Sequence, residues 1–159
     1  MYSSNSLIFA ITVLCLGSCC LADSKFEWTD CGSESGSLID VVVKDCFTKK
    51  CPLKRNENAS LTITFKSKVA SSNVTAVVNG EVLGFKQKFN LPNPYACEEV
   101  GLTCPLEPDC TYTYTNTIFV KPKYPRVSVD IYWELKDDDG ENIFCAIIPA
   151  QIVSETKKK

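Results

Sequence analysis

Cysteine is the residue type in this 159-residue chain with the most potential for chemistry. The chain has ten cysteines and no histidine. Cys15, Cys19 and Cys20 fall in an apolar N-terminal stretch, and the remaining seven are Cys31, Cys46, Cys51, Cys97, Cys104, Cys110 and Cys145. Only Cys46 with Cys51, or Cys104 with Cys110, approaches the spacing of a zinc clip, and zinc sites often need histidine. We therefore expect disulfides and no metal site.

The spacing of these seven cysteines suits two disulfides that close short loops and one disulfide between cysteines far apart in the sequence. Cys46 with Cys51, and Cys97 with Cys104, are close enough for local disulfides, which leaves Cys31 and Cys145 to join the start of the domain to its last strands. Cys110 is left over. No base lies near it in the sequence to activate its thiol, so we interpret it as an exposed thiol or as one that pairs between chains.

The other reactive side chains do not form a catalytic pattern. The absence of histidine removes the commonest general base and the usual partner of a serine or cysteine nucleophile. The acidic run Asp137-Asp138-Asp139 lacks the spaced ligands of a calcium loop, and with Gly140 it is typical of a solvated turn. The sequence therefore predicts a protein that is not an enzyme and that needs no cofactor.

The N-terminus has the features of a secretory leader. Leu7 to Leu16 is an apolar run too short to span a bilayer, and Cys20-Leu21-Ala22 is a plausible cleavage site, although no Lys or Arg precedes the run. We expect residues 1–22 to be a signal peptide, 23–159 to be one domain, and 153–159 to be a frayed tail. The expected location is secreted or extracellular, with the lysosomal lumen as the alternative. The net charge is 17 − 19 = −2, so the chain lacks the excess of positive charge that is typical of a nucleic-acid-binding protein.

Alternating polarity predicts strands along most of the domain. In Tyr124–Lys136, the residues Val127, Val129, Ile131, Trp133 and Leu135 share one face, and Pro125 is expected at the strand's entry. Further strands are predicted at 38–44, 61–66, 74–78, 111–120 and 143–153, with a tight turn at Asn79-Gly80 and an irregular, proline-rich excursion over 89–110. Six or seven strands without a helical stripe predict an all-β, two-sheet antiparallel sandwich.

Two glycosylation sequons lie beside predicted strands. These are Asn58-Ala59-Ser60 and Asn73-Val74-Thr75. Because the chain is expected to enter the secretory pathway, both Asn58 and Asn73 are candidate glycosylation sites.

A set of short motifs, in order along the whole domain, resembles a known family. They are Asp30-Cys31-Gly32-Ser33, Cys46 to Cys51-Pro52, Val78-Asn79-Gly80, Cys97 to Cys104-Pro105, Thr111-Tyr112 with Tyr114, Tyr124-Pro125, Trp133 with Leu135, and Phe144-Cys145 to Ile148-Pro149. Together they resemble the Niemann-Pick type C2 family of MD-2-related lipid-recognition (ML) domains.

The resemblance implies an immunoglobulin-like β-sandwich whose sheets part to admit a lipid between them. It implies the disulfides Cys31–Cys145, Cys46–Cys51 and Cys97–Cys104, and gives Cys110 no partner. Its pocket mouth corresponds to Phe89, Val120 and Tyr124, and its deeper wall to Val43, Phe65, Pro125, Val127, Val129, Trp133 and Ile148. Two positions depart from the family: a second indole is Ala146 here, and an apolar approach to the mouth is replaced by Lys86-Gln87-Lys88.

Two functions follow from the resemblance as expectations. In the first, the protein is a monomeric carrier that binds a sterol or another lipid and moves it between membranes or to a membrane-protein acceptor (NPC1-like), with transient contact to the membrane surface. In the second, it is a recognition protein that presents a fatty acid, semiochemical or microbial glycolipid to a receptor.

Overall fold

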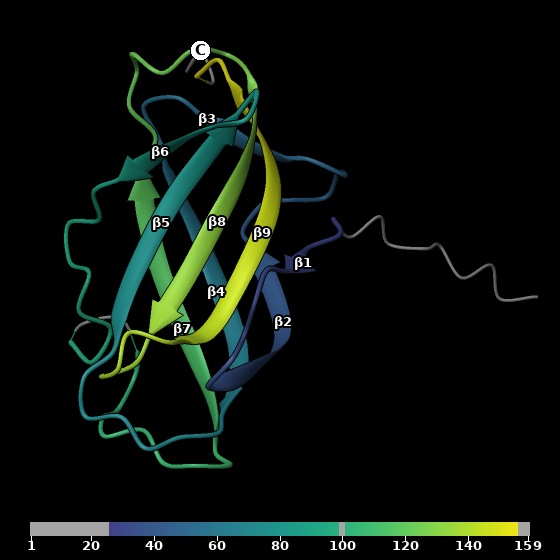
Figure 1. The fold of residues 1–159 in the computed structure, drawn as a ribbon. Helices are drawn as coiled ribbons and strands as arrows, with labels where there is room; N and C mark the ends of the chain where they lie inside the picture. Colours follow the sequence, from purple (N-terminus) through teal and green to yellow (C-terminus); the bar gives the residue numbers. More distant parts are fainter. Residues whose placement is uncertain (1–25, 99–100, 156–159) are drawn as a thin grey trace, which may run out of the picture.

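The computed structural model describes residues 26–98 and 101–155 as a two-layer β-sandwich (Figure 1). The predicted signal peptide and the end of the predicted tail lie outside these ranges. The described residues form no helix, and therefore none that could cross a membrane. The predicted all-β sandwich is confirmed.

The larger sheet has six strands. They are β1 (Thr29–Asp30), β3 (Cys51–Lys54), β5 (Thr75–Val82), β6 (Phe85–Phe89), β8 (Ser128–Lys136) and β9 (Asn142–Val153). Their order is β1-β9-β8-β5-β6, and β3 pairs with the end of β9. The β3–β9 pair is parallel, whereas the other pairs are antiparallel. Figure 1 shows β9 beside β8 near the centre of this layer.

The smaller sheet consists of β2 (Gly36–Val43), β4 (Asn58–Ser67) and β7 (Thr111–Phe119), in the order β2-β4-β7. Its inner face is apolar because alternate residues of each strand point the same way: Val41, Ile63 and Tyr114 are buried. Its outer face carries hydroxyl pairs across β4 and β7, with Ser60 Oγ 2.8 Å from Thr117 Oγ1 and Thr62 Oγ1 3.1 Å from Thr115 Oγ1.

The hairpin of β8 and β9 has the predicted inner face, with Val129, Ile131, Trp133 and Leu135 all buried. Its first strand begins at Ser128, later than the predicted Tyr124. The reason lies in the entry segment: Pro125 has no N–H to give to a ladder, and the Tyr124 N–H instead donates to the Lys121 carbonyl in a turn (3.1 Å). The segment 121–127 therefore remains a loop beside the sheet.

The predicted tight turn at Asn79-Gly80 is wrong. Both residues lie inside β5, and the chain reverses at Leu83 and Gly84, whose φ angles are 51° and 83°. Gly80 has a different reason to be glycine: a Cβ there would overlap the Phe89 ring and lie 3.1 Å from Val129 Cγ2. The missing side chain makes room for Phe89 on the inner face of β5.

The excursion between β6 and β7 is irregular, as predicted, and is tied to the residues before β5 and to the start of β5 itself. Ser71 and Leu106 exchange backbone hydrogen bonds of 3.2 and 2.8 Å, and Ala76 N donates to the Pro94 carbonyl (2.7 Å). The Cys97–Cys104 disulfide closes a loop within this excursion. Cys31–Cys145 and Cys46–Cys51 are the other two disulfides. These are the three pairs that the resemblance implied, and Cys110 is an exposed free thiol.

Candidate functional site

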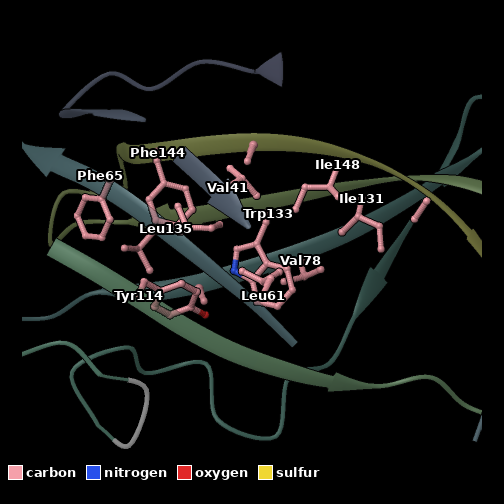
Figure 2. Packing of buried hydrophobic residues seen from close by; sticks show 14 of the residues in the cluster. Val41, Leu61, Phe65, Val78, Tyr114, Ile131, Trp133, Leu135, Phe144 and Ile148 are labelled. Atoms are coloured by element: carbon pink, nitrogen blue, oxygen red, sulfur yellow. The ribbon is translucent and has the colours of Figure 1, made fainter. Parts of the chain in front are cut away.

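The interior of the sandwich has two unlike halves, and Trp133 lies between them (Figure 2). On one side are packed aromatic rings. Tyr114 meets Trp133 at 6.2 Å between ring centroids, Phe144 lies 6.0 Å from Tyr114, and Phe65 lies 5.2 Å from Phe144. These packed rings close one end of the sandwich.

The other half is aliphatic and contains an inner void. The void has a volume of about 20 Å³, and its lining comes from both sheets: Val43, Cys51, Leu53, Ala59, Ser60, Leu61, Ile118, Ile131, Trp133, Ile148 and Ala150. Figure 2 shows Ile131 and Ile148 on the side of Trp133 that faces away from Phe65 and Phe144. The inner void is about the size of one water molecule, so side chains fill most of this half.

Two further hollows lie between the inner void and the surface. A middle void of about 20 Å³ shares Leu53, Ile118 and Ile131 with the inner void. A third hollow, the mouth, has a volume of about 470 Å³ and shares Phe89, Tyr124, Val129 and Ile152 with the middle void. The shared walls place the three hollows in sequence from the surface to Trp133, and the mouth volume lies within the range of small-molecule sites.

Phe89 and Tyr124 stand between the mouth and the middle void. Their rings meet edge to face, with 5.7 Å between centroids and 82° between planes. Phe89 is the last residue of β6, whereas Tyr124 belongs to the loop that leads to β8. Figure 1 shows β6 and this loop at the same end of the sandwich. Access to the interior therefore depends on two segments far apart in the sequence.

The mouth has a mixed lining, in which polar and basic residues stand beside apolar ones such as Val82, Phe85 and Val127. Its lining includes Gln87, Lys88, Asn90, Lys121 and Lys123, and no acidic residue. The two inner voids are lined by apolar residues, with three exceptions. These are Ser60 and the two aromatic residues with a polar atom, Trp133 and Tyr124. An amphipathic gradient thus runs from the basic surface to the aliphatic interior.

The structure brings together most of the residues that the resemblance assigned to a pocket. Phe89 and Tyr124 line the mouth and the middle void, and Val120 lines the middle void only. Of the assigned wall residues, Val43, Trp133 and Ile148 line the inner void; Pro125 and Val127 line the mouth, and Val129 lines both outer hollows. Phe65 is the exception, because it packs in the aromatic half and lines none of the three.

Several lining residues were not singled out from the sequence. Ile131 lies on the predicted inner face of β8 and Ile152 on β9, so parity could have found them. Leu53 lies on the short strand β3, which had no sequence signal. Lys121 and Lys123 belong to a loop whose path depends on the packing around it.

The site has little acid–base chemistry. No residue lining the three hollows is His, Asp or Glu. Burial raises the pKa of Tyr114, whose hydroxyl accepts a hydrogen bond from Asn116 Nδ2 (2.7 Å). Trp133 Nε1 is buried without a hydrogen-bond partner. Within residues 26–98 and 101–155, no three His, Cys, Asp or Glu side chains are grouped to hold a metal ion. The arrangement suits binding of an apolar molecule.

The two candidate glycosylation sites lie on the surface in different settings. Asn58 is exposed at the start of β4, opposite Phe119 of β7. Asn73 is also exposed, but its backbone N–H donates to Asp138 Oδ1 (3.0 Å), and its Nδ2 lies 3.4 Å from the same oxygen.

The fold and the hollows define a β-sandwich with an interior that opens at one end, and comparison with known proteins gives its family. Residues 25–152 match the ML domain family. The chain is 47% identical over 128 residues to the NPC intracellular cholesterol transporter 2 homolog a of Drosophila melanogaster, covering 79% of this chain and 86% of that protein. It is 37% identical over 146 residues to the mouse NPC intracellular cholesterol transporter 2, covering 91% and 97%.

A solved structure has the same fold. The Niemann-Pick type C2 protein from Japanese carpenter ant superposes with a TM-score of 0.76 at 32% identity, covering 80% of this chain and all of that one. This chain therefore belongs to the ML domain family. The resemblance to Niemann-Pick type C2 proteins that its motifs indicated is confirmed.

Proposed function

We propose that this protein is a lipid carrier that takes up one sterol-like molecule between its sheets and moves it between membranes or to a membrane-protein acceptor. The observation that carries the proposal is the line of three hollows, because it joins a mouth of about 470 Å³ to an apolar interior. The printed names of the fly and mouse relatives describe cholesterol transporters, which supports the choice of a sterol.

Uptake must widen the interior, since the middle and inner voids have volumes of only about 20 Å³ each. The driving force is sufficient for that. Burying about 500 Å² of sterol surface contributes on the order of 12 kcal/mol at about 25 cal/mol per Å². Association costs several kcal/mol, and separating packed side chains costs more. A micromolar affinity therefore needs no strong polar anchor.

The turn between β5 and β6 offers a membrane contact beside the mouth. Leu83 and Phe85 are 94% and 81% exposed, which is unusual for large apolar residues. Phe85 also lines the mouth. We propose that these two side chains enter the membrane interface during transfer, so that the lipid passes between bilayer and protein with little exposure to water.

The expected setting is the secretory pathway or the lysosomal lumen. Three disulfides are consistent with that location because they persist in oxidising compartments. The proposed role is binding and not catalysis, since the hollows lack a paired nucleophile and base.

The deciding experiment is native mass spectrometry of the protein purified from its natural source, combined with binding of the fluorescent sterol dehydroergosterol. A co-purified sterol, saturable uptake of the probe and its transfer to acceptor vesicles are expected. A co-purified acylated sugar with no sterol uptake would replace the carrier by a recognition protein. If neither a sterol nor any other lipid bound, the carrier proposal would fail.

A further inference from the structure

The charge at the mouth has the opposite sign to the charge of the protein. The chain has a formal net charge of −2, with 19 acidic and 17 basic residues. Three lysines, Lys88, Lys121 and Lys123, line the mouth, and no acidic residue does. A neutral lipid gives no reason for such a concentration of positive charge in a hollow.

The mouth lysines are also unpaired. No ion pair or side-chain hydrogen bond is found for Lys88, Lys121 or Lys123 among the described residues. Lys86, their neighbour in sequence, is different: its Nζ lies 3.8 Å from Glu81 Oε2 and 3.7 Å from the centroid of the Tyr132 ring. Lys86 is therefore held on the outer face of the sheet, a face that Lys88 shares by strand parity, whereas Lys121 and Lys123 keep their charge available to a ligand.

The interior fixes the orientation of such a ligand. The middle and inner voids have almost no polar lining, so a charged group there would lose its hydration without compensation. The polar end of a bound lipid must therefore remain at the mouth, where Gln87 and Asn90 add hydrogen-bonding groups beside the lysines. The apolar tail then points past Phe89 and Tyr124 toward Trp133.

We propose that Lys121 and Lys123 form a head-group site that selects lipids with an anionic head group over their neutral counterparts. This inference rests on the proposed carrier function and names the class of lipid that the carrier prefers. An ammonium near the surface gives each ion pair about a 1.4- to 5-fold gain in affinity. Two such pairs multiply to a preference of about two- to 25-fold, which should shrink as salt screens the charges.

The test uses two sterols that differ only in the head group, cholesterol and cholesterol sulfate, each displacing dehydroergosterol without vesicles present. The wild-type protein should bind the sulfate about two- to 25-fold more tightly at low salt, and the ratio should fall toward one at high salt. In the double variant Lys121→Gln/Lys123→Gln the ratio of the two affinities should also fall to about one. The charge-reversed pair Lys121→Glu/Lys123→Glu should favour cholesterol.

A matched control removes two lysines from the other end of the sandwich. Lys66→Gln/Lys68→Gln changes the net charge equally, at and just after the far end of β4, a ten-residue strand whose first residue lies opposite Phe119; unlike the mouth lysines, Lys66 is ion-paired, with Asp109 (2.8 Å). It should leave the preference unchanged. Equal binding of both sterols by the wild type, or a preference that survives Lys121→Glu/Lys123→Glu, overturns the head-group site but keeps the carrier. Failure of both sterols to bind overturns the carrier itself.

Discussion

The rings of Phe89 and Tyr124 meet edge to face, 5.7 Å apart, at the passage from the mouth to the interior. β6 and the loop before β8 touch through this pair, although they are 35 positions apart in sequence (124 − 89). The contact closes the passage without a covalent or charged link, so a lipid can displace it at modest cost.

Removal of either ring is expected to weaken sterol binding. Phe89→Ala and Tyr124→Ala each remove apolar surface that a bound lipid would contact, and losing about 1.5 to 3 kcal/mol lowers affinity roughly ten- to hundredfold. Titration with dehydroergosterol measures this. Tyr95→Ala is the control, since Tyr95 is exposed and lines none of the three hollows. Unchanged uptake in both passage variants would contradict the assignment.

Gly80 is expected to act through Phe89. In Gly80→Ala the new methyl group overlaps the ring and forces it toward Tyr124, at a cost of about 1 to 3 kcal/mol for overpacking. The double variant with Phe89→Ala should recover most of this loss, because the overlap disappears. Thermal unfolding of the wild type, the two single variants and the double variant measures the coupling energy between Gly80 and Phe89. Gly84→Ala is the control, because a Cβ there has no neighbour within 4 Å and the substitution tests backbone strain alone. If the losses of stability in Gly80→Ala and Phe89→Ala simply added, the contact between the two residues would be refuted.

Asp138 is expected to make folding stability depend on acid pH. Its carboxylate accepts hydrogen bonds from the backbone N–H groups of Ser72 (2.7 Å) and Asn73 (3.0 Å), which hold the pKa of Asp138 below its usual value. A lowered folded-state pKa gives stability that is present above the unfolded pKa of about 4 and is lost as pH falls through the folded value.

The variant Asp138→Asn should therefore be less stable than the wild type at pH 6 to 7. The difference should shrink as the pH falls below about 4 and vanish once the pH lies below the folded-state pKa of Asp138, where both side chains are neutral. Urea unfolding at a series of pH values measures it. Asp139→Asn is the matched control, because the Asp139 carboxylate accepts no hydrogen bond from Ser72 or Asn73. A constant difference across the whole pH range would mean that the carboxylate charge is irrelevant.

Affinity for the bound lipid is expected to stay nearly flat between about pH 8 and pH 6. The chain has no histidine, and no carboxyl group lines the hollows, so no lining group changes its charge in this range. Equilibrium titration of dehydroergosterol at each pH tests this. A steep loss centred near pH 6.5 would contradict it and would call for a titrating group outside the described lining.

Cys110 is expected to react with a maleimide in the folded protein, because it is the free and exposed thiol of the described residues. Mass spectrometry of a protein that begins at Asp23 should show one adduct, and Cys110→Ser should show none. The substitution should leave the thermal midpoint and the sterol affinity unchanged within error. Sedimentation should give a monomer with or without reductant; a dimer that disappears on reduction and in Cys110→Ser would show instead that this thiol pairs between chains.

The inner face of β8 could be predicted because its period of two assigns every side chain to a face. Trp133 and Leu135 are therefore buried as expected. The turn predicted at Asn79-Gly80 failed for a physical reason. The dipeptide is a strong turn signal locally, but Gly80 lies within a strand and is glycine because the Phe89 ring leaves no room for a side chain. The resemblance placed Lys86-Gln87-Lys88 at the approach to the mouth, and Gln87 and Lys88 do line it, but the two loop lysines could not be predicted from spacing. Lys121 and Lys123 reach it through a loop that β6 and β9 position, and those contacts are not encoded by neighbours in sequence.

The division of the interior at Trp133 would allow the proposed lipid exchange to proceed without unfolding. The aromatic rings beyond Trp133 can keep the sheets clamped while the opposite end widens, so the sheets would pivot about that cluster instead of coming apart. Amide protons of β4 near Phe65 should then exchange slowly whether the carrier is loaded or empty. The amide protons of β6 should report on occupancy.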